Sequence, residues 1–323
     1  MSSVVNLFAV PSAMSLKGYI KIARPDHWTK NIFVLPGTLL AALLQGVPLI
    51  ACLPNLLLGM VSVCLVASAN YVINEWLDAE FDRFHPTKHV RPSVAGGLRR
   101  GIVYTEYGLL VVGGLALGFC VSPAFGITSV LLLAMGVVYN VAPLRVKDRA
   151  IVDVLAESLN NPIRLALGWF VVTSNPLPPS SLLMGYWMGG AFLMAIKRFA
   201  EYRLIGDKEN AARYRRSFAY YSEEKLLISS FFYAMFCGLL MGVFLVKYRI
   251  ELLLLLPFLA VLFAWYFHLA FQPDSPVQYP ERLHRERGFL LYTIFTGALF
   301  VLLLVVDLPV LRWLLEKTFV TAQ

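Results

Sequence analysis

The chain has 323 residues, of which 58% are hydrophobic and only 15% are charged. Soluble globular domains are usually about 45–50% apolar, so this composition excludes an ordinary soluble protein and indicates a surface that largely faces lipid. The net charge of +8 could indicate nucleic-acid binding, but the basic residues lie in separate loops between apolar stretches, and we expect no nucleic-acid partner.

Apolar stretches recur along the chain, and most approach the ~20 residues that a helix needs to cross the ~30 Å hydrocarbon layer. Helices are expected because backbone polar groups in lipid must bond internally, and the sequence shows no barrel-like alternation. The sequence therefore predicts an all-α integral membrane protein, a single domain over residues 1–323 with about nine transmembrane helices. The predicted spans are Ile32–Ile50, Leu56–Ile73, Tyr107–Val121, Phe125–Val141, Ile151–Val172, Ser181–Ile196, Leu226–Val246, Leu252–Phe271 and Gly288–Val306.

The basic residues predict the orientation of these spans. In a nine-span arrangement, 23 of the 28 Lys and Arg residues fall on one side, in the N-terminal segment and four loops. Cytoplasmic loops carry such an excess of Lys and Arg. We therefore expect the N-terminus and the four basic loops to be cytoplasmic and the C-terminus to be outside, in a bacterial inner (plasma) membrane.

The second span runs into NEWLDAEFDRFHPTKHVRP, where Asn74, Asp78 and Asp82 are spaced by four and share one helix face. Carboxylates so close together repel unless a cation joins them, and Mg²⁺ is commonly shared between one or two carboxylates and substrate phosphates. Lys88 and Arg91 follow and suit phosphate oxygens. The motif predicts an Mg²⁺-phosphate site; the alternative is a solvated helix end.

The fifth span contains Asp153, Glu157, Asn160, Asn161 and Arg164. Ionisable residues inside a span are costly, and they usually face a bundle interior or a wet cavity where they have a function. We predict catalytic roles for the two acids, as acceptors of substrate hydroxyl hydrogen bonds, and phosphate binding for Arg164. An internal ion pair that only holds helices together is the alternative.

Further polar residues flank the fifth and sixth spans on the predicted cytoplasmic side. Before the fifth span, Tyr139, Arg145 and Lys147 could reach the same cavity. At the end of the sixth span, AIKRFAEYRLIGD places Lys197, Arg198 and Glu201 at the membrane exit, where the bases could bind phosphate or only anchor the helix. The following stretch, RYRRSFAYYSEEK, is typical of a solvated or interfacial helix.

Together these residues resemble the UbiA superfamily of intramembrane prenyltransferases, whose nine-helix fold carries an N-D-x-x-D-x-x-x-D motif after the second helix. Here that motif reads Asn74, Glu75, Asp78 and Asp82, with Glu75 in place of the usual first Asp. The resemblance adds Glu75 to the candidate Mg²⁺ ligands. The segments ARPDHWTKNIFVLP, HPTKHVRP and IKRFAE are most similar to the decaprenyl-phosphate phosphoribosyltransferase branch, whereas YNVAPLRVKDRAIVDVLAESLNNPIR departs from the known patterns.

The resemblance implies transfer chemistry in which Mg²⁺ binds a diphosphate and stabilises it as it leaves. We expect a phosphoribosyl donor with a polyprenyl phosphate acceptor; the alternative is a prenyl diphosphate donor with an aromatic or other small acceptor. In both cases the partners are a membrane lipid and a phosphorylated or small co-substrate. A transporter is a remote alternative, because transporter sites lie near the midplane on broken helices in both halves. A non-catalytic scaffold would not need three metal-competent oxygens on one face.

Overall fold

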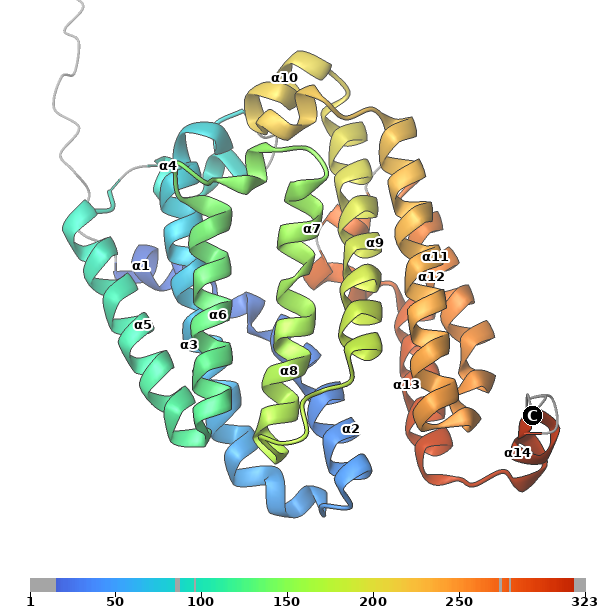
Figure 1. Cartoon of the computed structure of the whole chain (residues 1–323). Helices are drawn as coiled ribbons and strands as arrows, with labels where there is room; N and C mark the ends of the chain where they lie inside the picture. Colours follow the sequence, from blue (N-terminus) through green and yellow to red (C-terminus); the bar gives the residue numbers. More distant parts are fainter. Residues whose placement is uncertain (1–15, 85–87, 96, 273–274, 279, 317–323) are drawn as a thin grey trace, which may run out of the picture.

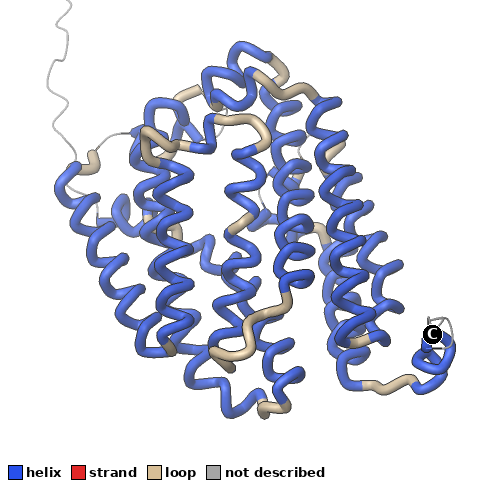
Figure 2. Tube along the Cα trace, viewed as in Figure 1, coloured by secondary structure: helices blue, strands red, loops and turns tan. Residues whose placement is uncertain are grey.

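The computed structural model describes residues 16–316 except 85–87, 96, 273–274 and 279, and every regular element among them is a helix (Figures 1 and 2). The longer α-helices are α3 (Leu49–Asp82), α5 (Arg100–Val121), α6 (Pro123–Asn140), α8 (Asn160–Val172), α9 (Ser180–Ile205), α11 (Glu223–Tyr248), α12 (Leu256–Leu269) and α13 (Arg287–Val305). The shorter ones are α1 (Leu16–Ile22), α2 (Leu35–Gln45), α4 (Pro92–Ala95), α7 (Val152–Ser158), α10 (Lys208–Tyr214) and α14 (Pro309–Glu316). The 3₁₀ helices are η1 (Pro25–Val34), η2 (Lys88–Val90), η3 (Val146–Asp148), η4 (Arg216–Ala219), η5 (Ile250–Leu255), η6 (Pro276–Gln278) and η7 (Pro280–Arg285).

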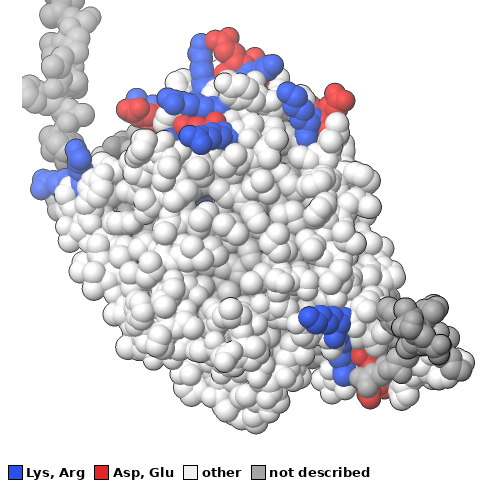
Figure 3. All heavy atoms as spheres, in the orientation of Figure 1, with Lys and Arg blue, Asp and Glu red and all other residues white. Residues whose placement is uncertain are grey.

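The all-α membrane architecture is confirmed. Within the described residues, six helical segments are long and apolar enough to cross a membrane: α3, α5, α6, α11, the run Ile250–Leu269, and α13. The surface has the matching pattern, because charged side chains gather at the end capped by α4 and α10 and again near α14, with a broad uncharged band between them (Figure 3). The count of nine spans stays a prediction, because the first, fifth and sixth expected spans are not among these six.

The first and fifth expected spans differ from single continuous helices, and local sequence explains both differences. Residues 32–50 belong partly to η1 and partly to α2, which ends at Gly46 with φ 68°, a left-handed cap that glycine adopts without strain. Residues 151–172 divide into α7 and α8 at Leu159. Pro162 lies one turn later and cannot donate the backbone bond that would continue a regular helix.

The short α2 is held by close backbone contact with α8. A Cβ atom on Gly37 would lie 1.9 Å from the Leu165 carbonyl oxygen, and one on Gly168 would lie 1.9 Å from the Val34 carbonyl oxygen. Only glycine permits these approaches. The Thr38 hydroxyl then donates to the Gly168 carbonyl at 3.0 Å, so η1 and α2 are fixed against the middle of the bundle.

Helices α3 and α9 extend beyond the apolar layer. With 34 residues α3 is about 50 Å long, well above the ~30 Å of hydrocarbon. Its last two turns therefore leave the lipid and carry Asp78 and Asp82 to the capped end. In α9, Lys197 and Glu201 lie near the same end, above a buried core that includes Phe199, and that core also supports the cap formed by α10 and η4.

Candidate active site

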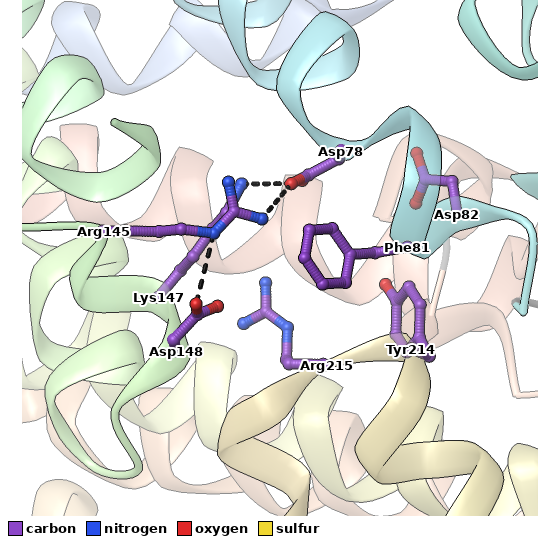
Figure 4. A pocket seen from close by; sticks show the side chains of 8 residues that line it. All are labelled: Asp78, Phe81, Asp82, Arg145, Lys147, Asp148, Tyr214 and Arg215. Carbon is purple, nitrogen blue, oxygen red and sulfur yellow. Dashed lines mark hydrogen bonds and ion pairs between the residues drawn. The ribbon is translucent and has the colours of Figure 1, made fainter. Parts of the chain in front are cut away.

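A small polar pocket of about 20 Å³ lies at the C-terminal end of α3. Three segments that are distant in the sequence meet there: the end of α3, the loop that contains η3, and the end of α10. The lining residues, shown in Figure 4, are Asp78, Phe81, Asp82, Arg145, Lys147, Asp148, Tyr214 and Arg215. Their charges and position make this pocket the candidate active site.

Asp78 is the centre of one ion-pair network (Figure 4). Its Oδ1 lies 2.5 Å from Lys147 Nζ and 2.8 Å from Arg145 Nη2. Asn74, one turn earlier on α3, donates its amide to Asp78 Oδ2 at 3.3 Å and also contacts Asn140. Asn74 and Asp78 therefore meet on one face of α3, and Arg145 and Lys147 reach this face from the η3 loop, whereas the sequence had suggested only the cavity of the fifth span for these two bases.

The η3 loop is built to present its bases to α3. Arg145 begins it with a positive φ of 27°, and its guanidinium lies 4.7 Å from the Phe81 ring centroid and pairs with Asp148 at 3.2 Å. Lys147 is buried, which lowers its pKa to about 8, while the neighbouring Asp78 acts in the opposite direction. The ammonium group is thus desolvated and held at the acidic face.

Asp82 and Glu75 interact with the loop that follows α3. Asp82 Oδ2 accepts from Arg91 Nη1 at 2.6 Å, and Ser93 Oγ donates to Glu75 Oε1 at 3.4 Å. Burial acts to lower the pKa of Arg91, but the carboxylates of Asp82 and Glu75 outweigh it and raise the pKa. Arg91 is therefore a firmly charged group beside Asp82. The side chain of Lys88, the other predicted base of this loop, lies outside the described part of the chain.

A second network lies behind the pocket, between α7, α9 and η4. Glu157 pairs with Arg198 and accepts from the Tyr139 hydroxyl at 2.6 Å. Arg198 also pairs with Glu201 at 2.7 Å. The structure thus brings together four residues that the sequence had placed on three separate segments.

Asp153 belongs to the same network and is fully buried, with 0% exposure. It accepts from the Tyr221 hydroxyl at 2.6 Å and from Ser217 Oγ at 3.1 Å, and it pairs with Arg215 at 3.0 Å. Asp153 therefore holds the η4 segment over the pocket. Its role as an acceptor for substrate hydroxyls stays a prediction.

Arg164 and Lys197 are not among the described residues that line the pocket. Arg164 Nε instead donates to Asn31 Oδ1 at 3.1 Å and joins α8 to η1. Lys197 lies half-buried on α9 and acts electrostatically on His27. Both basic groups therefore interact with η1 and not with the pocket.

Sequence reasoning missed the contribution of the segment after α9. Tyr214 and Arg215 line the pocket, and Arg215 also donates to the Tyr139 hydroxyl at 3.1 Å, so it joins the two networks. The prediction of a solvated or interfacial helix over RYRRSFAYYSEEK is wrong, because the stretch is divided among α10, η4 and the start of α11 and contributes to the pocket. The signal was the helix-like spacing of Tyr214, Phe218 and Tyr221, all of which are buried.

The donor set fits a metal that is shared with a substrate. Within the described residues, no three His, Cys, Asp or Glu side chains lie close enough to hold a metal ion by themselves. Asp78 and Asp82 nevertheless line the pocket with carboxylate oxygens from one helix end, and Asn74 lies one turn before Asp78, which suits Mg²⁺ completing its shell with waters and phosphate oxygens. The surrounding bases, which now neutralise the acids, are the side chains that such phosphates would attract.

Comparison with known proteins agrees with this geometry. Residues 32–283 match the model of the UbiA prenyltransferase family. Decaprenyl-phosphate phosphoribosyltransferase of Mycobacterium tuberculosis is 34% identical over 218 residues, which are 67% of this chain and 70% of that protein. The Mycolicibacterium smegmatis protein of the same name is 32% identical over 228 residues, 70% of this chain and 69% of its own.

The fold also matches a solved structure. A UbiA homologue from Archaeoglobus fulgidus, bound to GPP and Mg²⁺, superposes with a TM-score of 0.66 at 18% identity and covers 90% of this chain and 100% of its own. At that identity the likeness concerns the fold alone. The family model, the two mycobacterial relatives and the fold therefore agree with one another.

Proposed function

The chain belongs to the UbiA prenyltransferase family and is a UbiA-type intramembrane transferase, and from that premise we propose that it moves a phosphoribosyl group from phosphoribosyl diphosphate to a polyprenyl phosphate, releasing pyrophosphate. We choose this donor because Arg145, Lys147 and Arg215 give the pocket a basic lining. A donor with a diphosphate and a second phosphate needs cationic contacts at more than one point. The names of the mycobacterial relatives support the same choice.

The residues of the pocket suit this reaction. An oxygen of the lipid phosphate forms a bond to C1 of the ribose, the C1–O bond to the diphosphate breaks, and the electron pair leaves with the pyrophosphate. The lipid phosphate is already an anion, so no strong base has to remove a proton. Arg145, Lys147 and Arg215 would bind the departing diphosphate oxygens, and their desolvated charges act strongly where that negative charge develops.

The acidic face of α3 would hold the metal. Asp78 and Asp82 are the proposed Mg²⁺ ligands, with Asn74 and Glu75 assisting. When bound, Mg²⁺ supplies positive charge to the diphosphate as it leaves. The bases that neutralise the two aspartates in the structure would then turn to the phosphates, and the pocket would exchange one set of ion pairs for another.

The alternative is transfer of a prenyl group from a prenyl diphosphate to an aromatic acceptor. It shares the Mg²⁺-diphosphate step, and the Archaeoglobus fulgidus homologue was solved with GPP and Mg²⁺.

A labelled-substrate assay separates the two functions. Purified protein with Mg²⁺ is given radiolabelled phosphoribosyl diphosphate and decaprenyl phosphate, and label is counted in the organic phase. We expect lipid-soluble label that Lys147→Met reduces strongly and that Arg149→Met, at an exposed position two residues away, leaves unchanged. Absence of such label, together with prenylation of an aromatic acid from a prenyl diphosphate, would establish the alternative.

We further propose that the pocket opens to the cytoplasm in a bacterial inner membrane. The charge asymmetry of the loops supports this orientation. A phosphatase or fluorescent reporter fused after Gln323 tests it. Phosphatase activity outside the cytoplasm is expected, and a cytoplasmic C-terminus would refute both the orientation and the nine-span count.

A further inference from the structure

A second group of basic side chains lies at η1, and none of its members is among the described residues that line the pocket at Asp78. Arg24 directly precedes η1 and Lys30 lies within it, and both reach the ring of His27. Arg24 Nη2 lies 2.6 Å from His27 Nε2, and Lys30 Nζ lies 2.7 Å from His27 Nδ1. His27 is only 4% exposed, so two cationic groups are held against a buried ring.

Positive charge accumulates at this ring. A neutral imidazole has one N–H and one acceptor lone pair, whereas Arg and Lys side chains only donate. At most one of the two short contacts can therefore be a conventional hydrogen bond from a cation. Asp26 Oδ2 lies 3.5 Å from His27 Nε2, but the Asp26 side chain is 67% exposed. The four charged side chains that act most strongly on the pKa of the ring are the cations Lys30, Arg24, Lys197 and Arg91. A further anion among these groups would turn opposed donors into charge-assisted hydrogen bonds.

The backbone holds this arrangement in place. Arg24 has φ 52° and ψ 57°, a left-handed conformation that residues with a Cβ atom rarely adopt. Such outliers gather at binding and catalytic sites, and Arg145 of the pocket also has a positive φ. Segment η1 is anchored by Trp28, which donates to Ser68 Oγ at 2.8 Å, and by Asn31, which accepts from Arg164 at 3.1 Å. The bases are thus positioned in advance of any ligand.

The position of the group relative to the pocket suggests its ligand. Tyr71 on α3 touches the His27 ring edge-on, with ring centroids 5.3 Å apart. Asp78 lies seven residues further on, which is about 10 Å along the helix. A substitution at carbon needs the entering and leaving groups on opposite sides of that carbon, so a phosphate site at η1 beside Tyr71 and a diphosphate site beside Asp78, about two helical turns further along α3, could flank a sugar. Ile32, which follows the cluster, is 59% exposed on the outer surface.

We propose that Arg24, His27 and Lys30 bind the phosphate monoester of the lipid acceptor. The inference rests on the proposed function, in which the acceptor is a polyprenyl phosphate. The isoprenoid tail would leave along the apolar surface at the start of the first span, and the phosphate would meet the ribose from the side opposite to the pocket at Asp78.

The test measures lipid binding separately from turnover. Protein in phosphatidylcholine nanodiscs is titrated with radiolabelled decaprenyl phosphate, with unlabelled decaprenol as the uncharged competitor. We expect Arg24→Gln and Lys30→Gln each to weaken binding by about tenfold or more, as loss of a charge-assisted hydrogen bond predicts. Lys21→Gln, an exposed base on the neighbouring helix α1, should bind as wild type, and decaprenol should not compete.

Steady-state kinetics give the second readout. The KM for decaprenyl phosphate should rise in both variants while the KM for phosphoribosyl diphosphate stays constant. If Arg24→Gln does not fold, Lys30→Gln carries the test, and Lys30→Arg should restore binding. Unchanged lipid binding, or a rise confined to the KM of the donor, would overturn the inference. Charge-dependent lipid binding without transfer from phosphoribosyl diphosphate would uphold this site and refute only the proposed donor.

Discussion

The exits of α3 and α9 lie at the same end of the bundle and both combine acids with bases, but only the charged residues at the α3 exit line the pocket. At the α3 exit the side chains of Asp78 and Arg145 are 17% and 16% exposed and border an open pocket. At the α9 exit the Arg198–Glu201 pair is enclosed, with each side chain 3% exposed, although Glu157, which also pairs with Arg198, is 28% exposed. Ion pairs at a pocket can exchange partners with a substrate, whereas fully enclosed pairs cannot do so without opening the fold. We therefore infer substrate binding at the α3 exit and support of the site at the α9 exit.

The largest expected effect is on stability, at the enclosed network. Arg198→Ala leaves buried carboxylates without their cation, so we expect the free energy of unfolding to fall by about 3–5 kcal/mol. Thermal denaturation of the purified protein measures it. The control is Arg203→Ala on the same helix, whose side chain is 39% exposed and lies 3.8 Å from Glu223. In Arg203→Ala the free energy of unfolding should fall by only about 0–1 kcal/mol. Equal losses in the two variants would remove the contrast between enclosed and exposed pairs.

The next effect is on turnover, at the pocket. Asp78→Asn and Asp82→Asn each remove a charged Mg²⁺ ligand while keeping the side-chain shape. Turnover should fall by about 10²-fold or more if the ion supplies several kcal/mol of transition-state stabilisation. The initial rate of pyrophosphate release measures it, with insertion and purification unchanged.

Glu80→Gln is the matched control for these two variants, because Glu80 is exposed on the same stretch of α3. It should retain the wild-type rate. Full activity in both aspartate variants, or in the presence of a chelator, would exclude the metal mechanism.

The smallest expected effect is on the KM for the donor, at Arg215. This residue lines the pocket and also contacts the network around Asp153 and Tyr139. Arg215→Lys keeps the charge but loses the planar group that contacts Asp153 and Tyr139 together. We expect the KM for the donor to rise by about tenfold, the cost of one charge-assisted hydrogen bond. Arg213→Lys is the control, since Arg213 forms an exposed pair with Glu209 and should show wild-type kinetics. Identical kinetics in the two variants would limit Arg215 to a structural role.

The sequence by itself determined the membrane class, the helical architecture and the acidic exit of α3. These features depend on composition and on local periodicity: a helix in lipid needs a long apolar run, and residues four apart share a face wherever the helix lies. The same reasoning identified Lys147 and Arg198 as basic groups near the site, because each lies at the predicted cytoplasmic end of a span.

Only the tertiary structure decided which charges meet. Arg145 and Lys147 are 67 and 69 residues from Asp78 in sequence, and Arg215 reaches Asp153 across 62 residues. No local pattern encodes such pairings, since they depend on how helices pack. The close packing of α2 against α8 likewise depends on backbone contacts at Gly37 and Gly168, which lie far apart in the sequence and meet only in the folded bundle.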